Sequence, residues 1–215
     1  MVTKQFVETM KETATTYDAI AHELFGVAHG FETNPRYQAG NKMTSLVRSA
    51  EESTIKLRNL TSRVYEGGAD HFYEEVTSAM AITIMEEKNW IVINVPAILP
   101  KRNARDNTLY ITRPLRNCLV RFQREQPMER FRECMICIVH YYDEALGARR
   151  VRDYDNIETK RYLDVIESIL LTNDSGLLCS VLQTTELSDQ DLTQFYIMLP
   201  ESLPMWAKEH IKTHT

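Results

Sequence analysis

The apolar residues of the first third of the chain recur at helical spacings, and this pattern stops at Trp90. Intervals of three, four or seven residues place apolar side chains on one face of a helix. They occur on both sides of the loop "GFETNPRYQAGN", in the sets Phe6, Met10, Tyr17, Ile20, Leu24, Val27 and Met43, Leu46, Ala50, Leu57, Leu60, Val64. The spacing predicts two long amphipathic helices joined as a hairpin. Such apolar stripes are more often packing or dimerisation surfaces than cofactor sites.

A third helix is predicted over 70–87, with Phe72, Val76, Ala79 and Ile82 on one side. From Trp90 the β-branched residues and turn signals predict strands instead. The expected strands are "WIVINVP", "LYIT", "ECMICIVHYY", "LLCSVLQTT" and "QFYIML", with one helix over 114–125 and another over 157–171. The tail "PESLPMWAKEHIKTHT" is expected to form a short docked turn or helix. The expected fold is α+β, with a helical region over 1–88 and a mixed sheet with two packed helices over 89–215.

Length and composition are those of a globular protein. The chain has 215 residues and a formal net charge of −5, which is enough sequence to bury a core in one or two domains. No apolar run approaches the roughly 20 residues that span a bilayer, and "MVTKQFVETMKE" lacks the apolar segment of a secretory signal. We therefore expect a cytoplasmic location and no membrane partner.

The four cysteines are expected to be reduced thiols, because they are too few for a disulfide framework. Cys134 and Cys137 form a C-x-x-C pattern with His140 nearby, which suggests zinc. However, this segment is predicted to be a buried strand, in which positions three apart face opposite sides of the sheet. Structural burial is therefore favoured over metal binding.

Positive charge is concentrated in the middle of the chain. The net charge is −4 over residues 1–100, +5 over 101–161 and −6 over 162–215. A basic block in an acidic protein indicates an anionic partner. For Arg121 and Arg124 a solvated helix face is the preferred interpretation. The residues expected to contact phosphates are Lys101, Arg102, Arg105, Arg149, Arg150 and Arg152.

Acidic residues follow the last arginines in "RRVRDYDNIETKRYLDVIESILLTNDSG". Asp153 and Asp155 are two positions apart and would point the same way on an extended segment, and Asp174 lies in a later turn. Mg²⁺ prefers such carboxylate oxygens and could orient water for phosphodiester hydrolysis, with Lys160 neutralising charge on the phosphate. A structural alternative is a capping box in "DNIE", with Asp155 as the cap, and an ordinary turn in "NDSG".

The same stretch resembles the core of the RusA-type Holliday-junction resolvases, as does "VINVPAILPKRNARDN" upstream of it. The resemblance covers about half of the chain. It implies Mg²⁺-dependent cleavage of branched DNA by a homodimer, in DNA recombination and repair, with the acidic motif at Asp153, Asp155 and Asp174. The family's lysine position is Thr159 here, with Lys160 one place later. The N-terminal helices lie outside the family's minimal pattern.

Three functions remain open on these observations. The first is a metal-dependent, structure-selective DNA endonuclease. The second is a non-catalytic nucleic-acid-binding or adaptor protein with the same fold. The third is a protein-interaction module built on the N-terminal hairpin. Because Asp155 and Asp174 would lie near opposite ends of one straight helix, the first function could also require a site shared between the two subunits of a dimer.

Overall fold

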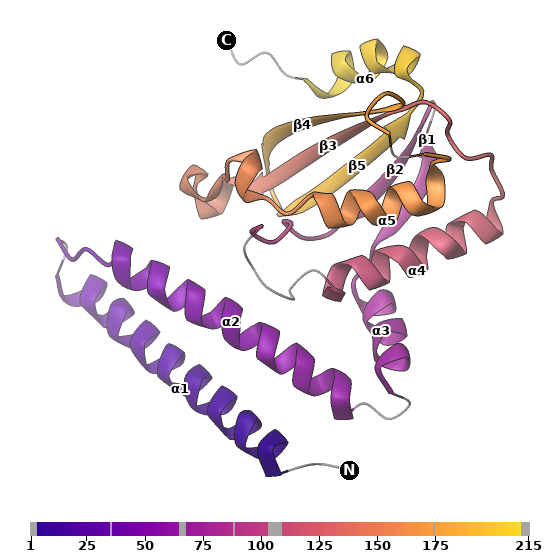
Figure 1. The fold of residues 1–215 in the computed structure, drawn as a ribbon. Coiled ribbons are helices and arrows are strands. Elements are labelled where there is room, and N and C mark those ends of the chain that lie inside the picture. The colour runs from indigo at the N-terminus through magenta and orange to yellow at the C-terminus, as the bar shows by residue number, and fades with distance from the viewer. Residues whose placement is uncertain are drawn as a thin grey trace. The chain divides into compact units, whose positions relative to one another are not determined.

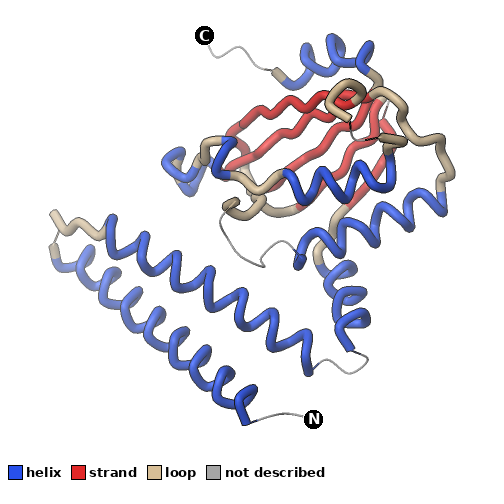
Figure 2. Tube along the Cα trace, viewed as in Figure 1, coloured by secondary structure: helices blue, strands red, loops and turns tan. Residues whose placement is uncertain are grey.

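The structure is a computed structural model that describes residues 4–34, 36–64, 68–87, 89–102, 109–173 and 175–211. The chain divides into two compact units, Met1–Phe72 and Tyr73–Thr215. Figures 1 and 2 show that the first unit is helical and that the second contains a sheet with helices on it. The expected mixed α+β fold is thus confirmed at the level of one five-stranded sheet and several helices.

The first unit is the predicted hairpin. Helices α1 (Lys4–Thr33) and α2 (Gly40–Val64) pack along their length. Their buried contact residues recur every seven positions, as a heptad pattern requires: Phe6, Thr13 and Val27 on α1, and Leu46, Ser53 and Leu60 on α2. The Tyr17 hydroxyl lies 2.9 Å from the Thr54 hydroxyl and links the two helices by a hydrogen bond.

The second unit is built on a sheet with the strand order β1-β2-β5-β3-β4. The strands are β1 (Thr83–Glu87), β2 (Trp90–Val95), β3 (Cys134–Asp143), β4 (Cys179–Ser188) and β5 (Leu192–Met198). Strand β5 runs antiparallel to both of its neighbours, β2 and β3, and β4 runs parallel to β3. Strands β2, β3 and β4 are therefore parallel to one another.

Parallel strands need long crossovers, and two helices supply them. Helix α4 (Leu109–Glu125) joins β2 to β3, and α5 (Lys160–Leu170) joins β3 to β4. Both lie on the same face of the sheet (Figure 1). Their apolar sides bury a core with alternate residues of the strands, among them Leu115, Leu119, Ile138, Ile166 and Phe195.

The opposite face of the sheet is covered by α6 (Leu203–His210), which follows a short 3-10 turn at Pro200–Ser202. Trp206 is fully buried there against Trp90, Val92, Cys137 and Tyr196. The C-terminal segment is docked as the sequence predicted. No helix in the described part of the chain has the length and apolar character needed to cross a membrane.

Two elements differ from the sequence prediction. The third helix, α3 (Gly68–Ala79), stops eight residues early, because Ala81 adopts a left-handed conformation with φ of 50°. The residues after it form β1, an edge strand paired with β2. The predicted strand "LYIT" is instead the first turn of α4, where Ile111 joins Leu115 in the core. Pro114 is tolerated near this end of the helix because few intrahelical hydrogen bonds are lost.

Trp206 should account for most of the binding of α6 to the sheet. Replacing a fully buried tryptophan by alanine leaves a large cavity, so we expect Trp206→Ala to lower the free energy of unfolding by about 3 kcal/mol or more. Urea denaturation followed by circular dichroism measures the change. Lys208→Ala, an exposed position in the same helix, is the control and should change the free energy by less than about 0.5 kcal/mol. Equal urea midpoints for Trp206→Ala and Lys208→Ala would contradict the conclusion that Trp206 accounts for most of the binding of α6 to the sheet.

Candidate functional site

The basic segment 149–152 is largely used to hold the fold together. The Arg150 guanidinium donates two hydrogen bonds to the Asp191 carboxylate, which also accepts the main-chain N–H of Asp143 at 2.8 Å. The Arg152 guanidinium donates to the main-chain oxygen of Leu99 at 2.7 Å. Two of the arginines expected to contact phosphates thus tie the segment to Asp191, just before β5, and to the loop after β2.

The predicted acidic cluster is not assembled as a metal site in the part of the chain that the structure describes. Asp153 and Asp155 are both exposed, at the start of a 3-10 turn (Tyr154–Asn156), and the Asp153 side chain makes no capping bond. Asp174 lies outside the described residues. Among the described residues, no group of three or more His, Cys, Asp and Glu side chains could hold a metal. Mg²⁺ binding stays a prediction without support from this geometry.

The capping-box alternative also differs from the structure. Helix α5 begins at Lys160, and the residue at its N-cap position is Thr159, which makes no side-chain capping bond, rather than Asp155. Glu158 accepts the main-chain N–H of Arg161 at 3.3 Å. Lys160, the candidate catalytic lysine, forms an ion pair with Asp164 one turn later at 3.0 Å.

The remaining predicted phosphate contacts are exposed or lie outside the description. Arg149, Lys101 and Arg102 are exposed. Two backbone contacts hold Lys101 and Arg102 beside the acidic segment: Lys101 forms a β-bridge with Ile157, and the main-chain N–H of Arg102 donates to the main-chain oxygen of Asn156 at 3.0 Å. Arg105 falls outside the described residues. The backbone thus places Lys101 and Arg102 beside the turn that carries Asp155.

The C-x-x-C pattern is part of the core. Cys134 packs on the α4 and α5 side of the sheet and Cys137 on the α6 side, in agreement with the strand interpretation. Burial raises the pKa of the Cys137 thiol to about 12 and also raises the pKa of Cys134. These thiols therefore strongly disfavour the thiolate form that binds zinc.

The N-terminal hairpin carries a second set of apolar positions that its own packing does not bury. On α1 they form two adjacent rows with a seven-residue period, one mainly of small residues and one of large residues. The rows are Val7, Ala14, Ala21, Ala28 and Met10, Tyr17, Leu24, Phe31. Leu24 is 48% exposed, and Phe25, beside the rows, is 77% exposed. On α2 the corresponding exposed residues are Met43, Val47 and Leu57.

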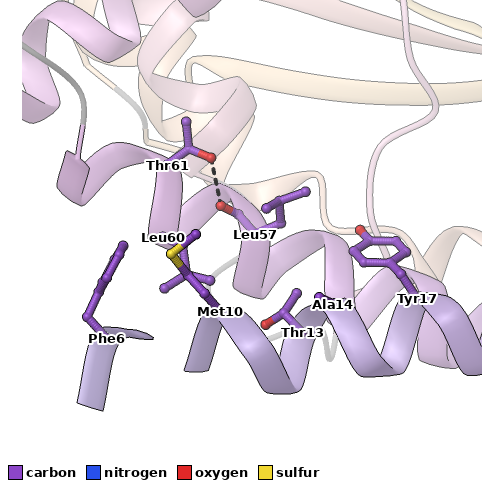
Figure 3. A pocket seen from close by; sticks show the side chains of 8 residues that line it. All are labelled: Phe6, Met10, Thr13, Ala14, Tyr17, Leu57, Leu60 and Thr61. Atoms are coloured by element: carbon purple, nitrogen blue, oxygen red, sulfur yellow. Dashed lines mark hydrogen bonds between the residues drawn. The ribbon is translucent and has the colours of Figure 1, made fainter. Parts of the chain in front are cut away.

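These rows border one hollow on the hairpin. Figure 3 shows Met10, Ala14 and Tyr17 of α1 facing Leu57 and Thr61 of α2 across it. Phe6, Thr13 and Leu60 complete the lining, and the cavity volume is about 300 Å³. The exposed rows of the two helices therefore lie on the same side of the hairpin. We call this side the hairpin face and define it by Met10, Ala14, Ala21, Leu24, Phe25, Ala28, Met43, Val47, Ala50 and Leu57.

The helical spacing of the sequence includes Met10, Leu24, Met43, Ala50 and Leu57 of this face, and it was interpreted as a packing or dimerisation surface. The available signal was the seven-residue period of α1, which continues in two rows beyond the one that a two-helix contact needs. The charged segment 149–176 attracted the functional prediction instead.

Asp191 is predicted to matter for stability, and Asp153 and Asp155 are not. Hydrogen bonding to Arg150 lowers the pKa of Asp191 from its ordinary value. The stabilisation is therefore complete above the unfolded pKa, about 3.9, and is lost as the pH falls through the lower folded pKa. We expect Asp191→Asn to lower the free energy of unfolding by about 1 kcal/mol at pH 7, and the difference from the parent protein to shrink below about pH 4.

Urea denaturation between pH 7 and pH 3 measures this dependence. Asp153→Asn and Asp155→Asn are the matched controls, because both carboxylates are exposed. Each should change the free energy of unfolding by less than about 0.5 kcal/mol. A cost for Asp153→Asn as large as that for Asp191→Asn would show that the acidic turn has a structural role that its geometry does not reveal.

Solved structures similar to part of the chain include three with a TM-score of 0.31. Two crystal structures of the periplasmic domain of Helicobacter pylori MotB, of residues 90–256 and 78–256, each align at 11% identity with a TM-score of 0.31. They cover 62% and 61% of this chain, and 91% and 94% of their own. A putative MotB-like protein from Desulfovibrio vulgaris aligns at 15% identity with a TM-score of 0.31, over 69% of this chain and 95% of its own. This similarity is too low to carry a functional argument. No curated protein matches the chain.

The resemblance to the RusA-type resolvases was wrong. One family model spans residues 3–215, which include both the N-terminal helices and the whole segment assigned to the nuclease core, and it describes a different family. The predictions that depended on the resemblance are withdrawn with it: a Holliday-junction endonuclease, a role in DNA recombination and repair, a branched or duplex DNA partner, and a dimer that completes an acidic site. The chain belongs to the family of unknown function DUF6100, whose model matches residues 3–215.

Proposed function

We propose that this protein is a non-catalytic protein-interaction module whose docking surface is the hairpin face. The observation that supports the proposal is the apolar exposure of that face. Leu24, Phe25, Val47 and Leu57 are 48%, 77%, 52% and 47% exposed. Isolated apolar residues on a surface are normal, but a contiguous apolar strip along two helices is typical of an interaction site.

Energetics favour a partner for this strip. A two-helix hairpin has one internal contact, so by itself it buries only the row of each helix that faces the other. Covering one exposed leucine or phenylalanine contributes roughly 1 to 3 kcal/mol. A partner that covers several residues of the hairpin face together gains enough to offset the entropy lost on association.

The spacing of the face also indicates the kind of partner. Rows with a seven-residue period accept the side chains of another α-helix, which repeat with the same period. The small row, with Ala14, Ala21 and Ala28, allows a helix to approach closely. The partner that fits this face is therefore a protein that presents an amphipathic helix.

A photo-crosslinking scan along α1 tests the proposal. Benzoylphenylalanine would be placed singly at Met10, Leu24 and Phe25 on the hairpin face, and at Thr15 and Ala19 on the outer side of the same helix. We expect crosslinks to protein from the first three positions and none from the other two, in cells that carry the gene. The decisive readout is this periodic pattern, since a partner helix contacts only one side of α1.

Exposure alone does not produce the expected pattern, because Thr15 and Ala19 are exposed as well. Crosslinks from all five positions would indicate random collision rather than docking. Crosslinks from none of the three face positions would contradict the proposed function.

A further inference from the structure

We propose that the helix pair that docks on the hairpin face is the same face of a second copy of this chain, and that α1 of each copy lies against α2 of the other. The result is a four-helix bundle with a two-fold axis parallel to the helices. The inference rests on the proposed function, because it names the partner of the same surface. It does not revive the dimer expected from the acidic site, since the contact lies in the other unit of the chain.

Charge supports a second copy in this arrangement. Helix α1 carries two lysines and five acidic residues, a net charge of −3. Helix α2 carries five basic and two acidic residues, a net charge of +3. Placing α1 of one copy beside α2 of the other brings together helices of opposite net charge, whereas placing α1 on α1 brings together two helices that each have a net charge of −3. Complementary charge selects the partner and its orientation.

The direction of the helices agrees with the charge argument. Rotation about an axis parallel to the helices leaves the chain direction unchanged, so α1 of one copy runs antiparallel to α2 of the other. All four neighbouring contacts are then antiparallel, as in an ordinary up-and-down bundle.

The residues that meet follow from the same rotation, because it also leaves each residue at its own height along the bundle. Tyr17 and Thr54 mark one height within the hairpin, since their hydroxyl groups are 2.9 Å apart. Counting outward from this pair in antiparallel directions predicts the contacts between copies. Residues of α1 meet residues of the partner's α2 in the pairs Ala14 with Leu57, Ala21 with Ala50, Leu24 with Val47, and Ala28 with Met43.

Two of the four predicted pairs join a large residue with a small one, and Leu24 with Val47 joins two larger residues. Leu57 and Met43, large and partly exposed, face alanines, and the one pair of small residues, Ala21 with Ala50, lies at the centre. Alternating large and small residues across a contact lets two layers interdigitate without voids. The face is its own complement, as a two-fold interface requires.

The area of the face is sufficient for a stable dimer. The 25-residue α2 is roughly 37 Å long, and two neighbouring helices are roughly 20 Å wide. Each copy would bury roughly 700 Å², or roughly 1,400 Å² in total, within the range of about 1,200 to 2,000 Å² for specific interfaces. A single helix from another protein would cover only part of this surface.

Sedimentation equilibrium on the full chain tests the identity of the partner. We expect a mass twice the 25.0 kDa of one chain. Leu24→Glu and Val47→Glu should each reduce it to the mass of one chain, because a charge would be buried within the contact. Ala19→Glu is the matched control: it adds the same charge at an exposed position on the outer side of α1 and should leave the dimer intact. Circular dichroism confirms that each variant is still helical.

Disulfide trapping tests the pairing of α1 with α2. Chains with Ala21→Cys are mixed with chains with Ala50→Cys, which differ by an affinity tag, and are oxidised. We expect a high yield of the disulfide between Ala21→Cys and Ala50→Cys chains. Either variant alone should form little disulfide-linked dimer, because equivalent helices lie diagonally across the bundle and their cysteines are too far apart. The native cysteines are buried and do not compete. A dominant bond between two Ala21→Cys chains would overturn the pairing.

The remaining outcomes separate this inference from the proposed function. A chain that sediments as a monomer but crosslinks to another protein only from the hairpin face would overturn the second copy and retain the interaction module. A monomer without face-specific crosslinks would overturn both. A dimer that survives Leu24→Glu and Val47→Glu must associate elsewhere, and it would overturn the inference as well.

Discussion

Burial of β3 on both faces is the constraint on which the sheet unit depends. Ile136 and Ile138 face α4 and α5, and Cys137 and Val139 face α6. A strand buried in this way must satisfy most of its polar groups internally. His140 Nε2 lies 3.1 Å from the Gln183 side-chain oxygen, and burial lowers the pKa of this histidine. The Tyr154 ring packs on the imidazole, so the segment after β3 is held against the sheet.

The same constraint explains why the basic segment is a poor guide to function. The chain must return from the end of β3 to the start of α5, and Arg150 and Arg152 fasten this return to Asp191 and to Leu99. Arginine is suited to the task because its planar group makes two directed hydrogen bonds to one carboxylate. The positive charges can be read from the sequence, but the hydrogen-bond partners of Arg150 and Arg152 within the fold cannot.

Local patterns predicted the elements that have strong periodicity. The rows of α1 and α2, the continuous apolar run of β3 and the strands β4 and β5 all follow from the sequence. The pattern did not reveal β1, because its five residues are mostly exposed and lack the alternation of buried and exposed positions that marks a strand. They were therefore included in the helix predicted over 70–87. It misplaced the start of α4, because Ile111 is compatible with a strand until its packing beside Leu115 is known. Asp153 and Asp155 fit a metal motif only when their geometry is ignored.

The two units differ in how completely they satisfy their own apolar surface. The sheet has a layer of helices on each face, so its core is closed within one chain. The hairpin has a single contact, for which the row of Phe6, Thr13, Ile20 and Val27 is sufficient on α1. The additional rows along the same helix expose apolar side chains to water, at a cost in solubility. A helix that needed only its hairpin partner could carry polar residues there, as amphipathic helices normally do. The surplus rows are explained when a second layer of helices covers them.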